Sequence, residues 1–404
     1  MRLTHLSLTN FRNFTRLDVD LPAGPLLLVG DNAQGKTSLL EAVYFAATLA
    51  SFHAQNDRQL INFLAAREPL AVARIVVDYH RAGSAHRLEI RIIQEPIPSD
   101  GLYRHSLMRK EMLLDGLKRK TSQVIGQFNA VLFLPHMLRV IEGVPEDRRR
   151  YLNLALAQVS AEYAEALSAY GRALTQRNAL LKQLGENGGD ATQLDFWDEK
   201  LAAAGAQLIR TRIQAVQELE RLAARLHSEL TRGSEVLRLA YQPAYDPLPP
   251  PPGQYSLPMD ALVDRSGISL EQIRQGFLTS LVRLRSEEIA RGVTTIGPHR
   301  DELRFLSNGI DLGIYGSRGQ VRTAMLALKL AEVAWMQAKT GEWPVLLLDE
   351  VLAELDIQRR ADLLERFSRC EQALLTTTDL DLFSTDFVQK ATLWNVQGGR
   401  IVVP

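Results

Sequence analysis

The sequence predicts an α/β fold in which a phosphate-binding domain, with a mixed sheet and flanking helices, is interrupted by an inserted antiparallel helical arm. Three observations support this prediction. An apolar run leads into the glycine-containing loop at residues 30–37, a second apolar run leads into Asp349 and Glu350, and helical periodicity fills much of the chain between them. A glycine-containing loop and an acidic pair of this type usually form a single phosphate-binding site. The chain between them must therefore leave the domain and return to it.

Length and composition are those of an ordinary globular protein with several domains. The 404 residues, 46% of them hydrophobic, are enough for two or three cores. The charges of the 47 basic and 47 acidic residues cancel, so a surface that binds nucleic acid would have to be a local basic patch. The single cysteine, Cys370, excludes an internal disulfide framework. With no signal peptide and no apolar run of roughly 18 residues, we expect a cytoplasmic protein.

The first lobe of the domain is expected at residues 1–140. Apolar alternation and β-branched residues predict its strands at 2–10, 17–21, 71–79, 86–94 and 131–134. A short turn with glycine at its centre joins the third and fourth of these strands into a hairpin. A helix is expected at 39–50, directly after the phosphate-binding loop.

The inserted domain is expected at residues 141–290. Apolar residues recur every three or four positions over 145–184 and again over 192–231, which is typical of amphipathic helices. Two helices of about 40 residues with a glycine-rich turn between them would form an antiparallel arm about 60 Å long, at 1.5 Å per residue. A helical bundle packed on the core is the alternative. The proline-rich stretch at 241–258 cannot be helical, and a further helix is expected at 270–290.

The second lobe is expected at residues 291–404, where the chain returns to the first domain. Apolar runs predict its strands at 303–306, 345–348, 373–376 and 392–396. A long helix is expected at 321–339, after a turn that contains serine and glycine. The helix start offers free N–H groups and a hydroxyl, which suit either an anion or a simple helix cap.

The loop at residues 30–37 fits the pattern Gly-x4-Gly-Lys-Thr between a strand and a helix. This spacing lets backbone N–H groups wrap the phosphates of ATP, with Lys36 on the β- and γ-phosphates and Thr37 on Mg²⁺. The expected nucleotide contacts are Gly30, Asp31, Asn32, Ala33, Gln34, Gly35, Lys36, Thr37 and Ser38. An apolar strand that ends in two acids implies a cation or a catalytic need. We therefore expect Asp349 to hold Mg²⁺ and Glu350, with Lys36, to serve catalysis.

Five motifs occur in an order that resembles a known family. They are LTNFRNF at 8–14, PEDRRRYL at 145–152, GPHRDEL at 297–303, YGSRGQ at 315–320 and DEVLAELD at 349–356. Together with the phosphate-binding loop they resemble the bacterial RecF family, a branch of the SMC-like DNA-repair ATPases in the ATP-binding-cassette (ABC) superfamily. The resemblance covers nearly the whole chain.

The resemblance implies an ABC-type ATPase head that binds ATP and Mg²⁺ and hydrolyses ATP weakly, with stimulation by DNA. Ser317 would contact the γ-phosphate bound to a second subunit, so that ATP drives a homodimer. The residues that the resemblance adds to the nucleotide site are Arg12, Ser317, Gly319, Gln320 and Asp356.

The family's role implies recombinase loading at gaps and stalled forks, in replication, recombination and the SOS response, with RecO-like and RecR-like partners and no membrane. Binding to duplex DNA and to single-strand/double-strand junctions would not depend on sequence, because no base-reading motif is present. Local basic clusters are the candidate phosphate contacts. They comprise Arg104, Arg109, Lys110, Lys118, Arg119, Lys120, Arg148, Arg149 and Arg150.

Other kinds of ATPase remain as alternatives. The main one is another SMC-like or ABC-type ATPase that uses the same ATP-driven dimer without DNA. The motif around Arg12 and the long helical insertion disfavour a transporter-type cassette. The insertion is too short for an SMC protein with long coiled arms. A nuclease fusion is disfavoured because no second acidic cluster follows residue 360.

Overall fold

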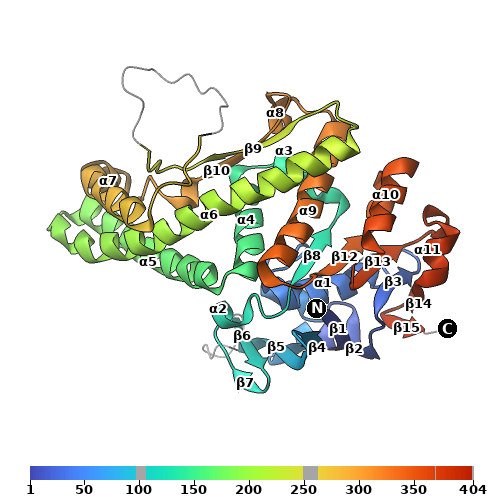
Figure 1. The fold of residues 1–404 in the computed structure, drawn as a ribbon. Helices are drawn as coiled ribbons and strands as arrows, with labels where there is room; N and C mark the ends of the chain where they lie inside the picture. The colour runs from blue at the N-terminus through green and yellow to red at the C-terminus, as the bar shows by residue number, and fades with distance from the viewer. Residues whose placement is uncertain (97–105, 249–262, 369, 403–404) are drawn as a thin grey trace. The chain divides into compact units, whose positions relative to one another are not determined.

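The computed structural model describes residues 1–96, 106–248, 263–368 and 370–402, and the chain divides into two compact units (Figure 1). Unit 1 comprises Met1–Met137 and Met336–Pro404, and unit 2 comprises Leu138–Trp335. Both ends of the chain therefore belong to one unit, with the insertion as the other.

The second expected boundary, at residues 290 and 291, differs from the division that the structure shows. Strand β10 (Glu302–Ser307) pairs along its whole length with β9 (Leu237–Gln242). Because of this pairing, the chain that follows residue 291 belongs to the same unit as the insertion. Unit 2 therefore continues to Trp335. A hydrogen-bonded partner more than fifty positions away cannot be read from local sequence.

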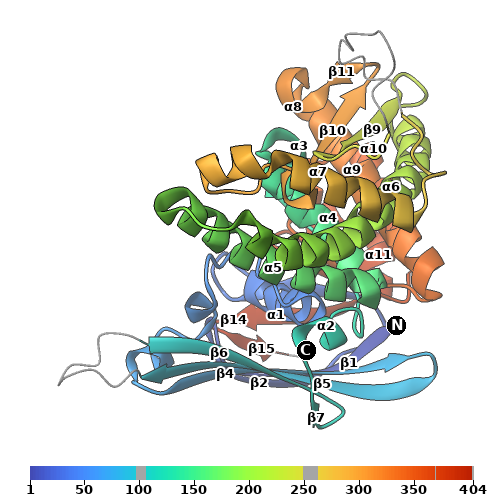
Figure 2. The same cartoon turned by 90° about the vertical axis from the view of Figure 1, so that its left-hand side faces the viewer.

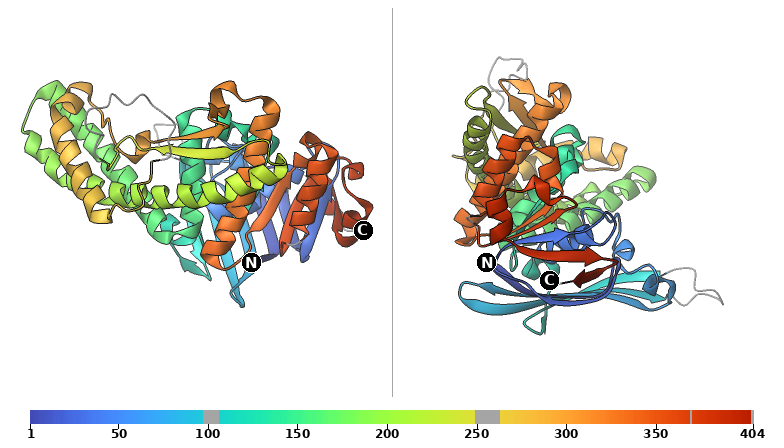
Figure 3. Two further views of the ribbon diagram at one scale, coloured as in Figure 1. Left: turned by 45° about the horizontal axis from the view of Figure 1, so that its top comes forward. Right: turned by 90° about the vertical axis from the view of Figure 1, so that its right-hand side faces the viewer.

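One sheet of unit 1 is parallel except at one edge, with the order β15-β14-β3-β13-β12-β8. Its strands are β3 (Gly24–Val29), β8 (Ala130–Phe133), β12 (Val345–Asp349), β13 (Gln372–Thr377), β14 (Thr392–Gln397) and β15 (Arg400–Val402). Figure 3 shows strands from both ends of the chain side by side in this sheet. Interior parallel strands are buried on both faces, which explains why they read as continuous apolar runs.

The other sheet of unit 1 is antiparallel, with the order β2-β1-β4-β5-β6-β7. Its strands are β1 (Arg2–Phe11), β2 (Phe14–Asp20), β4 (Ala71–Arg81), β5 (Ser84–Pro96), β6 (Ser106–Leu114) and β7 (Leu117–Lys118). The four strands predicted here are confirmed. Strands β6 and β7 were not predicted, because their charged residues pair with acids on neighbouring strands and resemble a solvated basic run.

Helix α1 (Lys36–Thr48) is buried between the two sheets of unit 1 (Figure 2). Leu39, Leu40, Val43 and Phe45 are fully buried, on several sides of the helix. A helix that is apolar all round belongs in a core. Because α1 begins at Lys36, its burial fixes the phosphate-binding loop against the rest of unit 1. The other helices of unit 1 are α2 (Thr121–Val124), α10 (Ile357–Phe367) and α11 (Thr385–Lys390).

Unit 2 is mainly helical and carries a small antiparallel sheet with the order β11-β10-β9, in which β11 is Ile310–Asp311. Its helices are α3 (Arg139–Glu142), α4 (Pro145–Val159), α5 (Ala161–Asn187), α6 (Asp195–Leu230), α7 (Leu270–Arg291), α8 (Leu312–Tyr315) and α9 (Arg318–Thr340), whose last residues belong to unit 1. Among the helices of the described ranges, none is long and apolar enough to span a bilayer.

The predicted antiparallel pair of helices corresponds to α5, of 27 residues, and α6, of 36 residues, with two differences from the prediction. The first predicted helix is broken at Ser160, which ends α4 and caps α5 by accepting from the Tyr163 N–H at 3.1 Å. Helix α7 adds a third helix, packed against both α5 and α6 (Figure 1). Gly205 permits this close packing, since a Cβ there would lie 2.6 Å from the ring of Phe277.

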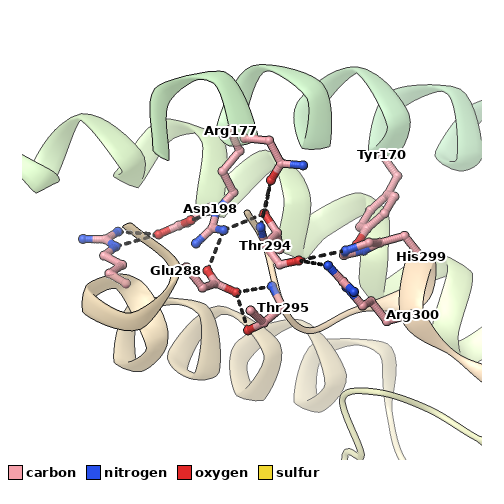
Figure 4. Close-up of polar contacts among 10 residues, drawn as sticks. Tyr170, Arg177, Asp198, Glu288, Thr294, Thr295, His299 and Arg300 are labelled. Atoms are coloured by element: carbon pink, nitrogen blue, oxygen red, sulfur yellow. Dashed lines mark hydrogen bonds and ion pairs between the residues drawn. The ribbon is translucent and has the colours of Figure 1, made fainter. Parts of the chain in front are cut away.

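A buried group of charges joins these three helices (Figure 4). The Arg177 guanidinium on α5 donates to Asp198 on α6 and Glu288 on α7, each at 2.6 Å, and to the Thr294 hydroxyl at 2.8 Å. Arg285 is a second cation for Asp198, at 2.5 Å. The side chains of Arg177, Asp198 and Glu288 are fully buried. Removing one partner from such a group costs roughly 3–5 kcal/mol, so the group favours this one arrangement of the helices.

His299 extends the buried group in its neutral form (Figure 4). Its Nδ1 lies 2.7 Å from the Tyr170 hydroxyl and its Nε2 lies 3.2 Å from the Thr294 carbonyl oxygen. The ring therefore accepts at Nδ1 and donates from Nε2. Burial lowers the pKa of His299 from 6.5 to about 4.

We expect the stability of unit 2 to fall as the pH is lowered from about 6.5 towards about 4. In this window the unfolded chain takes up a proton at His299, whereas the native ring stays neutral, so protonation favours unfolding. The loss is at most roughly 3 kcal/mol. The free energy of urea unfolding, measured at about pH 7.5 and about pH 5, should depend less on pH in His299→Gln than in the unaltered protein. An identical pH dependence would contradict this account.

Candidate nucleotide-binding site

The carboxyl ends of three neighbouring strands bring the two ends of the chain together. Val29 of β3 lies opposite Thr377 of β13, and Thr376 of β13 lies opposite Asp349 of β12. The loop that follows β3 and the acids that end β12 therefore leave the parallel sheet at the same edge. Ligands of open α/β sheets bind at this edge.

Two glycines shape the loop at residues 30–37. Gly30 and Gly35 have φ angles of 155° and 115°, which glycine adopts far more readily than other residues. A Cβ on Gly30 would collide with the Val396 carbonyl oxygen, and one on Gly35 would lie 2.5 Å from Nδ2 of Asn13. Gly35 is also the N-cap of α1, so the first N–H groups of the helix face the loop.

The Lys36 ammonium is held by the loop itself. It donates to the carbonyl oxygens of Gly30 at 2.5 Å and Asp31 at 3.0 Å. A carboxylate oxygen of Glu350 lies 3.5 Å from the same nitrogen. A lysine fixed beside a ring of backbone N–H groups is suited to bind phosphate oxygens.

The Thr37 hydroxyl joins the loop to β12. Its oxygen lies 2.9 Å and 3.0 Å from the two carboxylate oxygens of Asp349, which is 312 positions away in the sequence. Thr376 lies on β13, the strand between β3 and β12, and donates its hydroxyl to the same carboxylate at 2.7 Å. Because Asp349 is only 8% exposed, these hydroxyls satisfy a carboxylate that would otherwise be buried without partners.

The oxygens of Thr37 and Asp349 fit Mg²⁺. This ion prefers hard oxygen ligands and is usually held by one or two protein groups together with water and phosphate oxygens. Thr37 and Asp349 would hold it, and the bound ion would neutralise charge on the phosphates. In the part of the chain that the structure describes, no cluster of three or more His, Cys, Asp or Glu side chains offers another metal site.

Glu350 lies beside the phosphate-binding loop with its side chain 40% exposed. Its φ angle is 51°, an uncommon conformation for a residue other than glycine. The Glu350 N–H donates to the Thr376 hydroxyl at 3.1 Å, which holds this conformation. An accessible carboxylate next to Lys36 is in a suitable position to orient an attacking water.

Arg12 follows β1 and is tied to α1. Its guanidinium makes two hydrogen bonds to the buried Glu41 carboxylate, at 2.6 Å and 2.8 Å, and donates to the Gln59 carbonyl oxygen at 2.9 Å. Ser51 donates to the same carboxylate. The structure thus gives Arg12 a structural role next to the loop's helix, in addition to the expected one at the nucleotide.

Comparisons with known proteins agree with this architecture. The RecF/RecN/SMC N-terminal domain family matches residues 2–394. The chain belongs to this family. A protein of Roseiflexus castenholzii named DNA replication and repair protein RecF is 40% identical over 411 residues, which cover 99% of each chain. A protein of the same name from Symbiobacterium thermophilum is 39% identical over 405 residues, and the alignment covers all of this chain and 98% of that protein.

A solved structure gives the same result for the fold. It is described as the recombination mediator protein RecF with ATP in the RecFOR pathway, and it matches 99% of this chain and 96% of its own at 27% identity, with a TM-score of 0.82. The fold is therefore the ATPase head of the RecF/RecN/SMC family, with its helical insertion. This confirms the fold class predicted from the sequence.

The segment around Ser317 lies in unit 2. The Ser317 N–H donates to Gln320 Oε1 at 3.0 Å, and the Gln320 N–H donates to Ser317 Oγ at 3.3 Å, which is a capping box. Gln320 also donates to Glu235 at 3.3 Å. Ser317, Arg318 and Gly319 are exposed. The start of α9 thus presents a hydroxyl and free helix N–H groups, which suit an anionic oxygen.

Asp356 lies in unit 1 as the N-cap of α10. Its carboxylate accepts from the Arg359 N–H at 2.9 Å and pairs with the Arg359 side chain at 3.2 Å. The side chain is 54% exposed. It is therefore accessible to a second molecule.

The basic residues of unit 1 that the sequence singled out are largely paired within the antiparallel sheet. Arg109 contacts Glu95 and Glu111, each at 2.8 Å, and Lys118 contacts Glu111 at 2.9 Å. Lys110 pairs with Asp57 at 3.0 Å. Arg119 and Lys120 are exposed. Arg104 lies outside the described residues.

The arginines that open α4 differ from one another in their surroundings. Arg148 pairs with Glu302 at 2.5 Å and 2.8 Å and is only 12% exposed. Arg149 donates to the Asp301 carbonyl oxygen at 2.9 Å, and burial lowers the pKa of its guanidinium. These two side chains hold unit 2 together, so the sequence-based interpretation of both as DNA contacts is not supported. Arg150 is exposed.

Three contributors to the site were not predicted from the sequence: Thr376, Glu41 and the turn formed by Gly398 and Gly399. Thr376 follows an apolar run and lies near the carboxyl end of parallel strand β13, so its position was a usable signal. Glu41 is an acid on an otherwise apolar helix face, which was a weaker signal. The glycine turn, whose two N–H groups donate to Gln34 of the loop, gave no signal, because this contact depends on tertiary structure.

We expect Thr376→Val to reduce the turnover of ATP by about 10-fold or more, since the hydrogen bonds of this hydroxyl to Asp349 and Glu350 are removed with little change in shape. The affinity for ADP without Mg²⁺ should stay unchanged. Steady-state hydrolysis and calorimetric titration measure the two effects. Thr48→Val, which removes a hydroxyl bonded to Tyr44 on α1, is the matched control. An equal reduction in the two variants would contradict the assignment.

Proposed function

We propose that this protein is an ATP-dependent DNA-binding protein of replication and repair, and that ATP binding and hydrolysis control its association with DNA. The observation that carries the proposal is the contact between Thr37 and Asp349, which joins a phosphate-binding loop to an acidic strand end. Full-length relatives with the name DNA replication and repair protein RecF support the biological role.

ATP with Mg²⁺ is the proposed substrate. Lys36 would bind the phosphates, Thr37 and Asp349 would hold the metal ion, and Glu350 would orient the attacking water. Hydrolysis by one chain would be slow, because the anion-binding turn at Ser317 is expected to complete the site of a second copy. A two-fold dimer would then contain two nucleotides between identical surfaces.

The dimer predicts a change of mass with nucleotide. Glu350→Gln should bind ATP without hydrolysing it, and light scattering should give the mass of two chains with ATP and of one chain with ADP. Ser317→Arg should bind ATP but stay at the mass of one chain, because a large cation would block the interface. A Glu350→Gln protein that stays monomeric with saturating ATP would contradict the dimer.

DNA contact would be made through phosphates, without base readout. Arg119 and Lys120 are the best candidates in unit 1 because they are exposed, whereas Arg109 is held between two acids. Replacing both with alanine should weaken binding to gapped DNA and reduce the slope of log K against log salt by roughly 0.9 for each phosphate that is no longer neutralised. Arg109→Ala is the control and should leave the slope unchanged. A slope that is the same in all three proteins would exclude this surface.

Partners of the RecO and RecR type belong to the same proposal. The solved relative is described as part of the RecFOR pathway, and we extend that role to this chain. The alternative is an ATPase of the same family that uses its ATP-driven dimer without DNA. A rate of hydrolysis that does not respond to duplex, gapped or single-stranded DNA would favour this alternative.

A further inference from the structure

The hairpin formed by β14 and β15 contacts the phosphate-binding loop. Its turn consists of Gly398 and Gly399, with φ angles of 55° and 72° between the paired residues Gln397 and Arg400. Two central residues with positive φ are typical of a type I′ turn, which favours glycine at both positions. The turn therefore presents two backbone N–H groups with little side-chain bulk.

Both of these N–H groups donate to Gln34. The Gly399 N–H donates to the Gln34 carbonyl oxygen at 2.9 Å, and the Gly398 N–H donates to Oε1 of the Gln34 side chain at 2.7 Å. Asn13 Nδ2, from the turn between β1 and β2, donates to the same Gln34 carbonyl oxygen at 3.2 Å. One peptide of the loop is thus held by donors from two segments remote in sequence.

Holding the Gln34 carbonyl fixes the direction of the next N–H. The peptide between Gln34 and Gly35 is planar and trans, so its C=O and N–H point in opposite directions. Two donors on the carbonyl side direct the Gly35 N–H away from the hairpin. In a loop of this pattern the backbone N–H groups wrap the phosphates, and Gly35, with its φ of 115°, would otherwise permit this peptide to rotate.

The surroundings of this peptide are closely packed. A Cβ on Gly399 would lie 2.8 Å from the Asn13 carbonyl oxygen, and a Cβ on Gly35 would lie 2.5 Å from Asn13 Nδ2. The turn, Asn13 and the loop thus leave no room for larger residues at these glycines.

We propose that Asn13 and the turn Gly398–Gly399 are positioning residues for the nucleotide, which act by fixing the peptide between Gln34 and Gly35 so that the Gly35 N–H is aimed at a phosphate. The inference rests on the proposed binding of ATP by the loop. It adds the C-terminal hairpin to the nucleotide site as a support that acts through Gln34.

Calorimetric titration with MgADP tests this proposal without requiring hydrolysis or a dimer. Asn13→Ala removes one donor and should weaken MgADP binding by about 3- to 10-fold. Asn13→Asp should weaken it more, because its carboxylate would repel the Gln34 carbonyl oxygen. Gly399→Ala should also weaken it, since its Cβ displaces Asn13. Unfolding temperatures measured without nucleotide identify any variant that is merely destabilised.

Gly83→Ala is the matched control. Gly83 occupies the same second position in the hairpin turn between β4 and β5, has a φ of 78°, and has no atom within 4 Å of an added Cβ. The substitution introduces the same backbone strain away from the loop, so MgADP binding should be unchanged. Equal weakening by Gly83→Ala and Gly399→Ala, or unchanged binding by both Asn13 variants, would overturn the proposal.

The amide resonance of Gly35 provides a direct readout. In protein labelled with ¹⁵N-glycine, MgADP should shift this resonance in the unaltered protein and shift it less in Asn13→Asp at saturating nucleotide. The same shift in both proteins would overturn the positioning role. The variant Lys36→Ala distinguishes a failure of the proposed ATP site from a failure of the positioning role. If the unaltered protein binds MgADP no better than Lys36→Ala does, the proposed ATP site is wrong and the inference is wrong with it. If the unaltered protein binds MgADP better than Lys36→Ala, and both Asn13 variants bind it as well as the unaltered protein, only the inference is rejected.

Discussion

The register of three parallel strands is the constraint on which the rest of the structure depends. Strands β3, β13 and β12 are hydrogen-bonded side by side, so the loop after the first and the acids after the last lie at one edge of the sheet. The Thr37–Asp349 contact follows directly from this register. A shift of one residue in either pairing would turn every buried side chain of a strand to the opposite face. Because both faces are buried and apolar, it is the close packing of side chains of different sizes that opposes such a shift and so protects the site.

Each part of the site is held from more than one side. Helix α1 is fixed by the core between the sheets, Glu350 is held through its backbone by Thr376, and the loop is held through Gln34 by the C-terminal hairpin. Such contacts set the site's geometry in the protein itself and reduce the ordering required when a ligand binds. Within unit 2, the buried charges around Arg177 hold helices α5, α6 and α7 together.

The chemistry of the site could be predicted from the sequence more fully than its supports. A phosphate-binding loop needs fixed residue types at fixed spacing, so residues 30–37 are recognisable without a structure. Strand β6 was not recognisable, because its charges are neutralised by acids that only the folded sheet brings near. For the same reason Arg148 was interpreted as a DNA contact, although Glu302 pairs with it. The break at Ser160 depended on a single cap within a continuous helical pattern.

A double-mutant cycle between Thr37 and Asp349 tests whether the two ends of the chain form one site for MgATP. ATP affinity would be measured with and without Mg²⁺ for Thr37→Val, Asp349→Asn and the double variant. We expect each single change to remove most of the gain in affinity from Mg²⁺, and the double change to add little more, with a coupling of about 1 kcal/mol or greater. Additive effects of the two changes, or equal effects without Mg²⁺, would contradict this expectation.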